Sequence, residues 1–330
     1  MQASSSHRQR IVPAYIDVHH HALPRLYVEA VGEHAITAQA PRYSRASLDW
    51  TADRSIAEMD QHGVAAAVLS MSAPGLWFGD QAFTTRLARC CNDEMAAEVA
   101  RRPGRFGFFA ALPLPGVDDA LAEIRHAFDT LGADGIGLLS TYGNLHLGDA
   151  AFAPVMQELD RRHAVVFVHP TLPDASKPFA TDFPASILEF PVDTTRTVLS
   201  LLYSGTLARC PNIRFIFSHA GGATPFLAHR LARLEQDEER ARMVPGGALA
   251  LLQRQYYDVA LSANPPALAA LTTFVPSTQI LFGSDYPFAP NMTARTQAGL
   301  AAHGFSSEDA ARIEHGNAAP LFPRLMAARG

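Results

Sequence analysis

The sequence is poor in cysteine and in charge, and it has no long hydrophobic run. It contains 3 cysteines in 330 residues, an odd number without CxxC spacing, which excludes a disulfide-stapled miniprotein and suits a reducing compartment. Its 27 Lys+Arg and 32 Asp+Glu are not grouped by sign, so nucleic acid and anionic membranes are not expected partners. Apolar stretches such as 65–69 and 248–252 are far shorter than the ~18 residues of a membrane span. We expect a soluble, cytoplasmic protein.

The beginning of the chain lacks the apolar segment of a secretory signal. Residues 1–10 are mostly polar, and we expect them to form a disordered tail. The whole chain is 48% hydrophobic and long enough to bury roughly three quarters of its unfolded surface. No linker-like stretch divides it. Residues 11–330 are therefore expected to form a single domain.

Short aliphatic runs alternate with segments of helical period, which is typical of repeated βα units. The predicted strands are 15–19, 64–70, 106–111, 135–139, 164–169, 213–219, 256–260 and 279–282. An open doubly wound sheet is the competing architecture, but no GxGxxG follows the first strand. Eight repeats in one domain favour an α/β fold of the (β/α)8 TIM barrel type.

Capping residues and proline positions give the expected helices and loops. Asp80, Asp118 and Asp149 are predicted N-caps of helices that run to about residues 102, 131 and 162. Residues 32–49 and the proline-rich residues 170–186 are expected to be long loops. Both follow a strand, so both should lie at the carboxyl-terminal face, where barrel enzymes have their active sites.

Three consecutive histidines end the first predicted strand. Because alternate strand residues share a face, His19 and His21 can point into the barrel together while His20 points away. Converging imidazoles suit a divalent transition metal. Taken alone, the run can also be a solvated turn or an adventitious metal site. Asp17 is expected on the same face as His19, either supporting the site or as an ordinary structural residue.

Polar residues also end three later strands. His169 ends the fifth, His219 the sixth, and Asp285 follows the eighth. A buried titratable side chain is costly unless it has a partner. Each could be a hydrogen-bonded rim residue, but together with the first strand they predict a metal site at one end of the barrel.

The motifs DVHHHALP, VFVHP, FSHAGG and FGSDYP, in this order, resemble the amidohydrolase superfamily. Within it they are similar to the branch of metal-dependent decarboxylases that includes aminocarboxymuconate-semialdehyde decarboxylase and γ-resorcylate decarboxylase. Residues 72–80, 194–196 and 204–207 look most like 6-methylsalicylate decarboxylases. The resemblance covers about residues 17–322 and implies a barrel of the metal-dependent hydrolase type.

By this resemblance, the ligands of one divalent metal are His19, His21, His169 and Asp285. Zinc is the expected ion, with manganese as the alternative. No lysine follows the fourth strand, where binuclear relatives carry a bridging carbamylated lysine, so a single metal is favoured. His219 matches the catalytic histidine, and Asp285 has a second, catalytic role.

The resemblance also implies substrate contacts and an oligomer. Arg230 matches an arginine that some relatives send into the neighbouring subunit, which predicts a homodimer or larger homo-oligomer. Arg230 can equally be a solvated helix residue. Trp77 can form a wall for an aromatic substrate or simply pack beside its turn. Cys90 and Cys91 are expected to be structural.

The implied function is non-oxidative decarboxylation of an aromatic carboxylic acid, an ortho-hydroxybenzoate like 6-methylsalicylate, by a carboxy-lyase. The alternative is metal-dependent hydrolysis of a lactone, ester or amide, because the same ligands can lower the pKa of bound water. A fold alone does not separate these reactions. A non-catalytic metal-binding barrel and a barrel without metal are the remaining alternatives.

Overall fold

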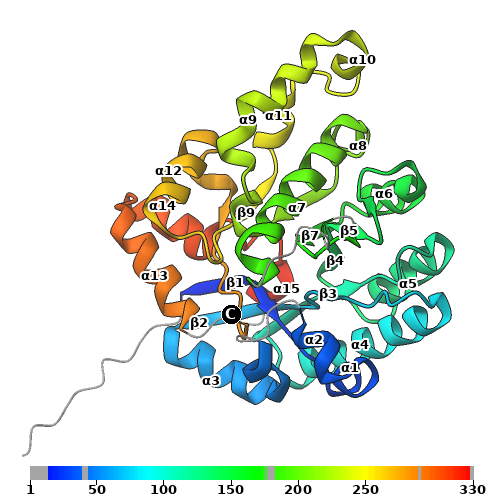
Figure 1. Cartoon of the computed structure of the whole chain (residues 1–330). Helices are drawn as coiled ribbons and strands as arrows, with labels where there is room; N and C mark the ends of the chain where they lie inside the picture. The colour runs from blue at the N-terminus through cyan, green and yellow to red at the C-terminus, as the bar shows by residue number, and fades with distance from the viewer. Residues whose placement is uncertain (1–13, 39–43, 175, 177–182, 289–290, 328–330) are drawn as a thin grey trace, which may run out of the picture.

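The computed structural model describes residues 14–38, 44–174, 176, 183–288 and 291–327. Within these residues, eight parallel strands form one sheet that helices surround (Figure 1). In pairing order they are β1 (Tyr15–His21), β2 (Val64–Ser70), β3 (Phe106–Ala111), β4 (Gly135–Leu139), β7 (Val165–His169), β8 (Arg214–Phe217), β9 (Tyr256–Asp258) and β10 (Ile280–Leu281). A short hairpin of β5 (Thr141–Tyr142) and β6 (Leu145–His146) follows β4.

The sheet closes on itself through the segment that follows β10. The backbone N–H of Val18 donates to the carbonyl of Phe282 at 3.1 Å, and that of His21 donates to Tyr286 at 2.7 Å. The N–H of Asp285 donates to the carbonyl of His19 at 2.9 Å. These bonds join the last strand to the first, so the predicted (β/α)8 barrel is confirmed.

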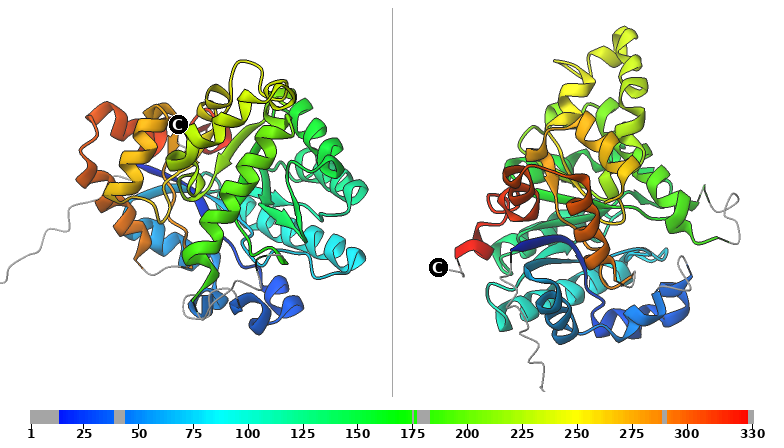
Figure 2. Two further views of the ribbon diagram at one scale, coloured as in Figure 1. Left: turned by 45° about the horizontal axis from the view of Figure 1, so that its top comes forward. Right: turned by 90° about the vertical axis from the view of Figure 1, so that its left-hand side faces the viewer.

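Helices of very different length connect the strands. They are α1 (Arg25–Val31), α2 (Glu33–Thr37), α3 (Ala52–His62), α4 (Gln81–Arg101), α5 (Val117–Asp129), α6 (Ala153–Arg161), α7 (Ala185–Tyr203), α8 (Thr206–Arg209), α9 (Thr224–Ala232), α10 (Glu238–Ala241), α11 (Ala248–Gln253), α12 (Pro265–Phe274), α13 (Met292–His303), α14 (Ser307–Ala311) and α15 (Pro323–Ala327). Helices α9, α10 and α11 extend away from the barrel on one side (Figures 1 and 2). None of the described helices is long and apolar enough to cross a membrane.

The predicted caps are partly correct. The Asp80 carboxylate accepts the N–H of Phe83 at 3.0 Å and caps α4. Asp118 is not a cap, because α5 begins at Val117 and places Asp118 in its first turn, where a carboxylate favours the helix dipole. Asp149 caps a single 3-10 turn that precedes α6 rather than α6 itself.

The two expected loops contain helix. Residues 32–49 include α2 and a 3-10 helix, Ser44–Asp49, so the prediction of a loop was wrong there. In the second loop, residues 175 and 177–182 lie outside the described residues, and α7 begins at Ala185. The expected tail, residues 1–10, also lies outside them, and the domain boundary at residue 11 stays a prediction.

Two apolar layers pack on the strands. The inner one fills the barrel and contains Ile16, Val18, Ala66, Val68, Phe109, Val165, Phe167, Ile216, Leu281, Ala318, Leu321, Phe322 and Leu325. The outer, larger one packs the other face of the strands against the helices. Strands buried on both faces need apolar residues at every position, which explains the continuous apolar run of β2.

Candidate metal centre

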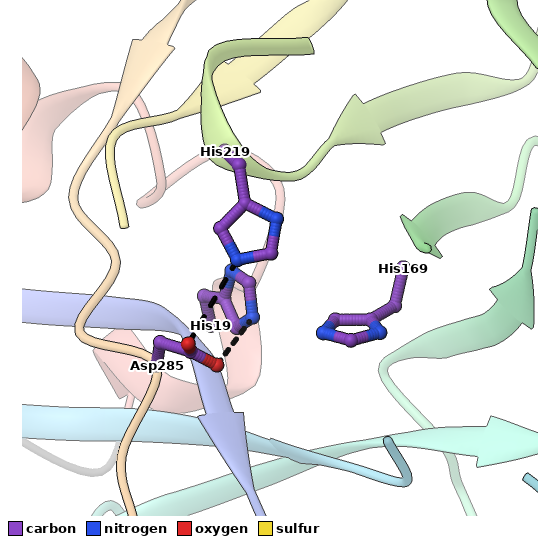
Figure 3. A group of neighbouring side chains, drawn as sticks. All are labelled: His19, His169, His219 and Asp285. Atoms are coloured by element: carbon purple, nitrogen blue, oxygen red, sulfur yellow. Dashed lines mark ion pairs between the residues drawn. The ribbon is translucent and has the colours of Figure 1, made fainter. Parts of the chain in front are cut away.

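The polar residues that end the strands meet at the carboxyl-terminal face of the barrel. His19 projects from β1 and His169 from β7 toward the same point, beside Asp285 and His219 (Figure 3). One side-chain N or O atom from each of these four residues lies within 4.8 Å of the others, and all four residues are buried. His21 joins them, because its Nε2 lies 3.0 Å from Nε2 of His19 and 3.1 Å from Oδ1 of Asp285.

A bulge in β1 decides which side chains enter this group. Asp17 pairs with Ala67 and His20 with Leu69, so β1 advances by three residues where β2 advances by two. The extra residue breaks the strict alternation of side chains. His19 faces the interior as predicted, but Asp17 lies on the side of His20, whose Nδ1 is 3.0 Å from Oδ2 of Asp17. The expectation that Asp17 and His19 share a face was wrong for this reason.

Asp17 holds the backbone of the site. Its Oδ1 accepts the backbone N–H of His19 at 3.1 Å and that of Ser284 at 3.0 Å. His20 completes this support on the outer side, since its Nε2 lies 3.0 Å from Oγ of Ser55 and its ring stacks on Tyr286 at 4.7 Å. Asp17 therefore joins the end of β1 to the turn that carries Asp285.

Asp258 is a buried residue of this group that sequence reasoning missed. It is fully buried at the end of β9, and its Oδ2 lies 3.0 Å from Nδ1 of His19. Its Oδ1 accepts the backbone N–H of His219 at 3.2 Å and of Ala260 at 2.9 Å. The predicted strand ran on to Ala260 and placed Asp258 within it. In the structure β9 ends at Asp258 itself. The signal that could have identified this residue was therefore an acidic side chain at the end of a strand.

The other two histidines are oriented in the same way. Nδ1 of His21 lies 2.9 Å from Oγ of Ser70, and Nδ1 of His169 lies 2.8 Å from the carbonyl oxygen of Pro170. With Nδ1 occupied by a hydrogen-bond partner, each imidazole directs Nε2 toward the centre. Such outer partners fix the tautomer and direction of a metal-binding histidine.

The charges of the group are strongly coupled. Burial opposes a charge on His19, but Asp258 and Asp285 outweigh it and raise the pKa of His19 to about 10. Burial lowers the pKa of His21 to about 4 and holds the pKa of His169 well below its ordinary value. Burial also opposes ionisation of Asp285, yet the His19 and His21 imidazoles hold its pKa well below the usual range. The group thus combines an anionic carboxylate with the neutral imidazoles of His21 and His169, and a bound cation would take the place of the proton on His19.

His219 differs from the other histidines because its ring nitrogens make no hydrogen bond to the described residues. Within the described residues, neither ring nitrogen has a hydrogen-bond partner, and Nε2 lies 3.8 Å from Oδ2 of Asp285. His219, Ala220 and Asp285 have φ values of 53°, 56° and 61°, in the left-handed region. Non-glycine residues are rare there, and such strain gathers at functional sites. Without a hydrogen-bond partner, the ring nitrogens are available to contact a metal or a substrate.

Two predicted site residues are not joined to this group. Trp77 is half-buried in the loop after β2, and Arg230 is exposed on α9. Among the described residues, no hydrogen bond, ion pair or ring contact links either side chain to the buried histidines and Asp285. Their substrate roles stay predictions.

The side chains present fit a divalent metal. Three imidazoles supply Nε2 donors with Nδ1 already satisfied, and one buried carboxylate supplies oxygen. Nitrogen and oxygen donors of this kind bind zinc and similar ions. The structure brings the four predicted ligands, His19, His21, His169 and Asp285, close together, and His219 lies beside them.

Comparisons with known proteins identify the family. The profile of a family described as amidohydrolase matches residues 16–324. The chain is 37% identical over 325 residues to the decarboxylase macB of Penicillium terrestre, covering 94% of this chain and 95% of that protein. It is 38% identical over 334 residues to 6-methylsalicylic acid decarboxylase acuB of Aspergillus aculeatus, covering 95% and 97%.

The fold is also similar to solved structures. A dihydroxybenzoic acid decarboxylase from Polaromonas sp. JS666, solved with bound manganese and 2-nitroresorcinol, superposes with a TM-score of 0.79 at 23% identity. The match covers 94% of this chain and 97% of that one. From the profile match and the full-length relatives, we conclude that the chain belongs to the amidohydrolase family.

Proposed function

We propose that the protein is a metal-dependent carboxy-lyase that removes CO2 from an aromatic carboxylic acid. One observation carries the proposal. A buried centre of three oriented imidazoles and one carboxylate lies beside an unpaired histidine, in a chain similar over nearly its whole length to named decarboxylases. The substrate we propose is an ortho-hydroxybenzoate like 6-methylsalicylate, which the name of the Aspergillus aculeatus relative supports.

His19, His21, His169 and Asp285 would hold one divalent metal. When bound, such an ion acts as a Lewis acid that orients the carboxylate and ortho hydroxyl and withdraws electron density from the ring. We propose zinc, the usual ion of histidine-rich sites. Manganese is the alternative, supported by its presence in the similar Polaromonas structure.

Two side chains would handle the proton. Loss of CO2 leaves an electron pair on the ring carbon, which must take up a proton. Asp285 would take up a proton from water and pass it to this carbon, or His219 would relay a proton from water, and general acid catalysis of this kind contributes about 10²–10⁴-fold. Nε2 of His219 lies 3.8 Å from Oδ2 of Asp285, which supports the proposal that both groups face the same substrate.

Substrate contacts and assembly complete the proposal. Arg230 would bind the substrate carboxylate from a neighbouring copy, since arginine pairs with carboxylates through two parallel hydrogen bonds. Its exposure on α9 supports this role, and it makes the active form a homodimer or larger homo-oligomer. Trp77 would face the aromatic ring. The cysteines are all unpaired, which supports a cytoplasmic location.

The experiment compares decarboxylation with hydrolysis. Protein reconstituted with Zn2+ or Mn2+, and the same protein treated with a chelator, are assayed for CO2 release from 6-methylsalicylate, salicylate and 2,6-dihydroxybenzoate, and for cleavage of lactones and esters. We expect metal-dependent CO2 release. Hydrolysis of a lactone or ester without CO2 release from any salicylate would contradict the proposal.

Variants of the ligands test the metal centre itself. His21→Ala and His169→Ala should each lose metal and activity together. His34→Ala, which removes an exposed histidine on α2, is the matched control and should keep both. Elemental analysis gives the stoichiometry, for which we expect one ion per chain. Full metal content in both ligand variants would refute the assignment.

A further inference from the structure

A second buried polar cluster lies behind the metal centre, around Asp193 of α7. Asp193 is fully buried. Its Oδ2 accepts hydrogen bonds from Oγ of Ser140 and from Oγ1 of Thr141, the latter at 3.3 Å, and its Oδ1 lies 3.1 Å from Nε2 of His146. Keeping a carboxylate away from water costs several kcal/mol unless its partners compensate. The partners of Asp193 therefore compensate the cost of burying its carboxylate.

Ser140 connects this cluster to a proposed metal ligand. Its backbone N–H donates to the carbonyl of His169 at 2.8 Å, and its Oγ accepts the backbone N–H of Thr171 at 3.0 Å. Ser140 is thus hydrogen-bonded to the residues on both sides of Pro170. The carbonyl of Pro170 is the group that faces Nδ1 of His169 at 2.8 Å, so the position of this turn sets the direction of the imidazole.

Helix α7 holds Ser140 at two points. Asp193 binds the Ser140 hydroxyl, and Thr197, one helical turn further, donates from Oγ1 to the Ser140 carbonyl at 2.7 Å. Residues four apart on a helix lie on one face, so both contacts come from the same side of α7. The helix therefore fixes the end of β4, and β4 fixes the turn that carries His169.

We propose that Asp193 and Ser140 are positioning residues for His169, which hold the 169–171 turn so that Nε2 of His169 faces the metal. The proposal rests on the metal centre proposed above. It also assigns a structural role to the hydroxyl groups of Ser140 and Thr141, which stand where a bridging lysine would be expected in a binuclear site. Here hydroxyl groups at the end of β4 support one ligand of a single metal instead.

The test measures metal affinity and ligand geometry rather than turnover. Metal-free wild type, Ser140→Ala and Asp193→Asn are titrated with Zn2+ and with Mn2+ against a chromophoric chelator. The same proteins are loaded with Co2+, whose visible spectrum reports the arrangement of its ligands. Thr194→Val is the matched control, since it removes a buried hydroxyl from α7 whose one hydrogen bond to the described residues goes to the carbonyl of Phe190 within the helix.

We expect Ser140→Ala to weaken both metals about 10-fold or more and to change the Co2+ spectrum, the usual scale for loss of an outer partner. Asp193→Asn should have a smaller effect in the same direction, and Thr194→Val none. Ser140→Thr, which keeps a hydroxyl, should restore affinity. These readouts separate positioning from a general loss of stability, because the control variant loses a comparable buried hydrogen bond.

The outcomes distinguish this proposal from the proposed function. Wild type that binds neither metal refutes the metal centre itself. Wild type that binds metal while Ser140→Ala and Asp193→Asn bind it equally well, with unchanged Co2+ spectra, overturns the positioning role alone. If both variants fail to fold without metal while Thr194→Val folds, judged by circular dichroism, the network serves folding and the proposal is also overturned.

Discussion

The two ends of the barrel interior contain different kinds of side chain. On β1, the inward residues Ile16 and Val18 come before His19, and on β7, Phe167 comes before His169. Because the strands are parallel, the polar ends of β1, β7 and β9 lie at the same end of the barrel. The amino-terminal end is filled by apolar side chains around Phe322, whereas the carboxyl-terminal end collects imidazoles and a carboxylate.

This difference separates stability from function. At the amino-terminal end each buried side chain gains from leaving water. At the other end, burial opposes the charge on Asp285, and two residues beside the centre, His219 and Ala220, have left-handed backbone conformations. An arrangement that breaks local rules in this way is expected at a functional site. Changes at the two ends should therefore affect different measurements.

The largest effect is expected at the polar end. Asp285→Asn should lower decarboxylation by about 10³-fold or more, because an amide cannot carry the carboxylic proton and is a poorer metal ligand. CO2 release by metal-loaded protein measures it. The variant should remain folded, and wild-type turnover in Asp285→Asn would remove Asp285 from the mechanism.

A substitution at the apolar end should instead change the stability of the protein. Phe322 is fully buried, and its ring meets that of Phe109 edge to face at 5.7 Å. Phe322→Ala should lower the free energy of unfolding by about 3–5 kcal/mol, the usual cost of such a cavity. Denaturant titration measures this, while kcat per folded molecule should stay unchanged. A proportional loss of kcat would show that the two ends are not separable.

His219 should separate catalysis from metal binding within the polar end. Because its ring nitrogens are unpaired, His219→Ala leaves no buried partner without a hydrogen bond. We expect kcat to fall by about 10²-fold, the scale of a lost acid or base, with metal content unchanged. Metal loss equal to that of His21→Ala would instead make His219 a ligand.

Asp258 should give the smallest effect of the four. Asp258→Asn keeps the size of the side chain but weakens its contact with Nδ1 of His19. Metal affinity should fall about 10–100-fold, as for other partners of metal-binding histidines. Competition with a chelator measures it. Affinity equal to wild type would mean that the bulged strand alone orients His19.

The sequence predicted the fold well because the barrel depends on local patterns. Strands β2, β3 and β4 begin and end where their apolar runs do. The family and the decarboxylase class were also predicted, from four short motifs at strand ends. The positions of His19, His169 and Asp285 at one face follow from parallel strands alone.

What the sequence could not give depends on irregularity and on distant contacts. The bulge in β1 moved Asp17 to the other face, and nothing in three consecutive histidines signals an extra residue. Asp258 contacts a residue 239 positions away, and Ser140 meets Asp193 across 53 positions. Such pairs become visible only when the strands and helices are assembled in space.

The most direct test of the account is decarboxylation in D2O. Metal-loaded protein is given 6-methylsalicylate, and the product is examined by mass spectrometry and NMR, with product incubated alone as a control for exchange. The account predicts metal-dependent CO2 release and one deuterium at the carbon that carried the carboxylate. CO2 release without that deuterium, or release that persists fully after the metal is removed, would contradict it.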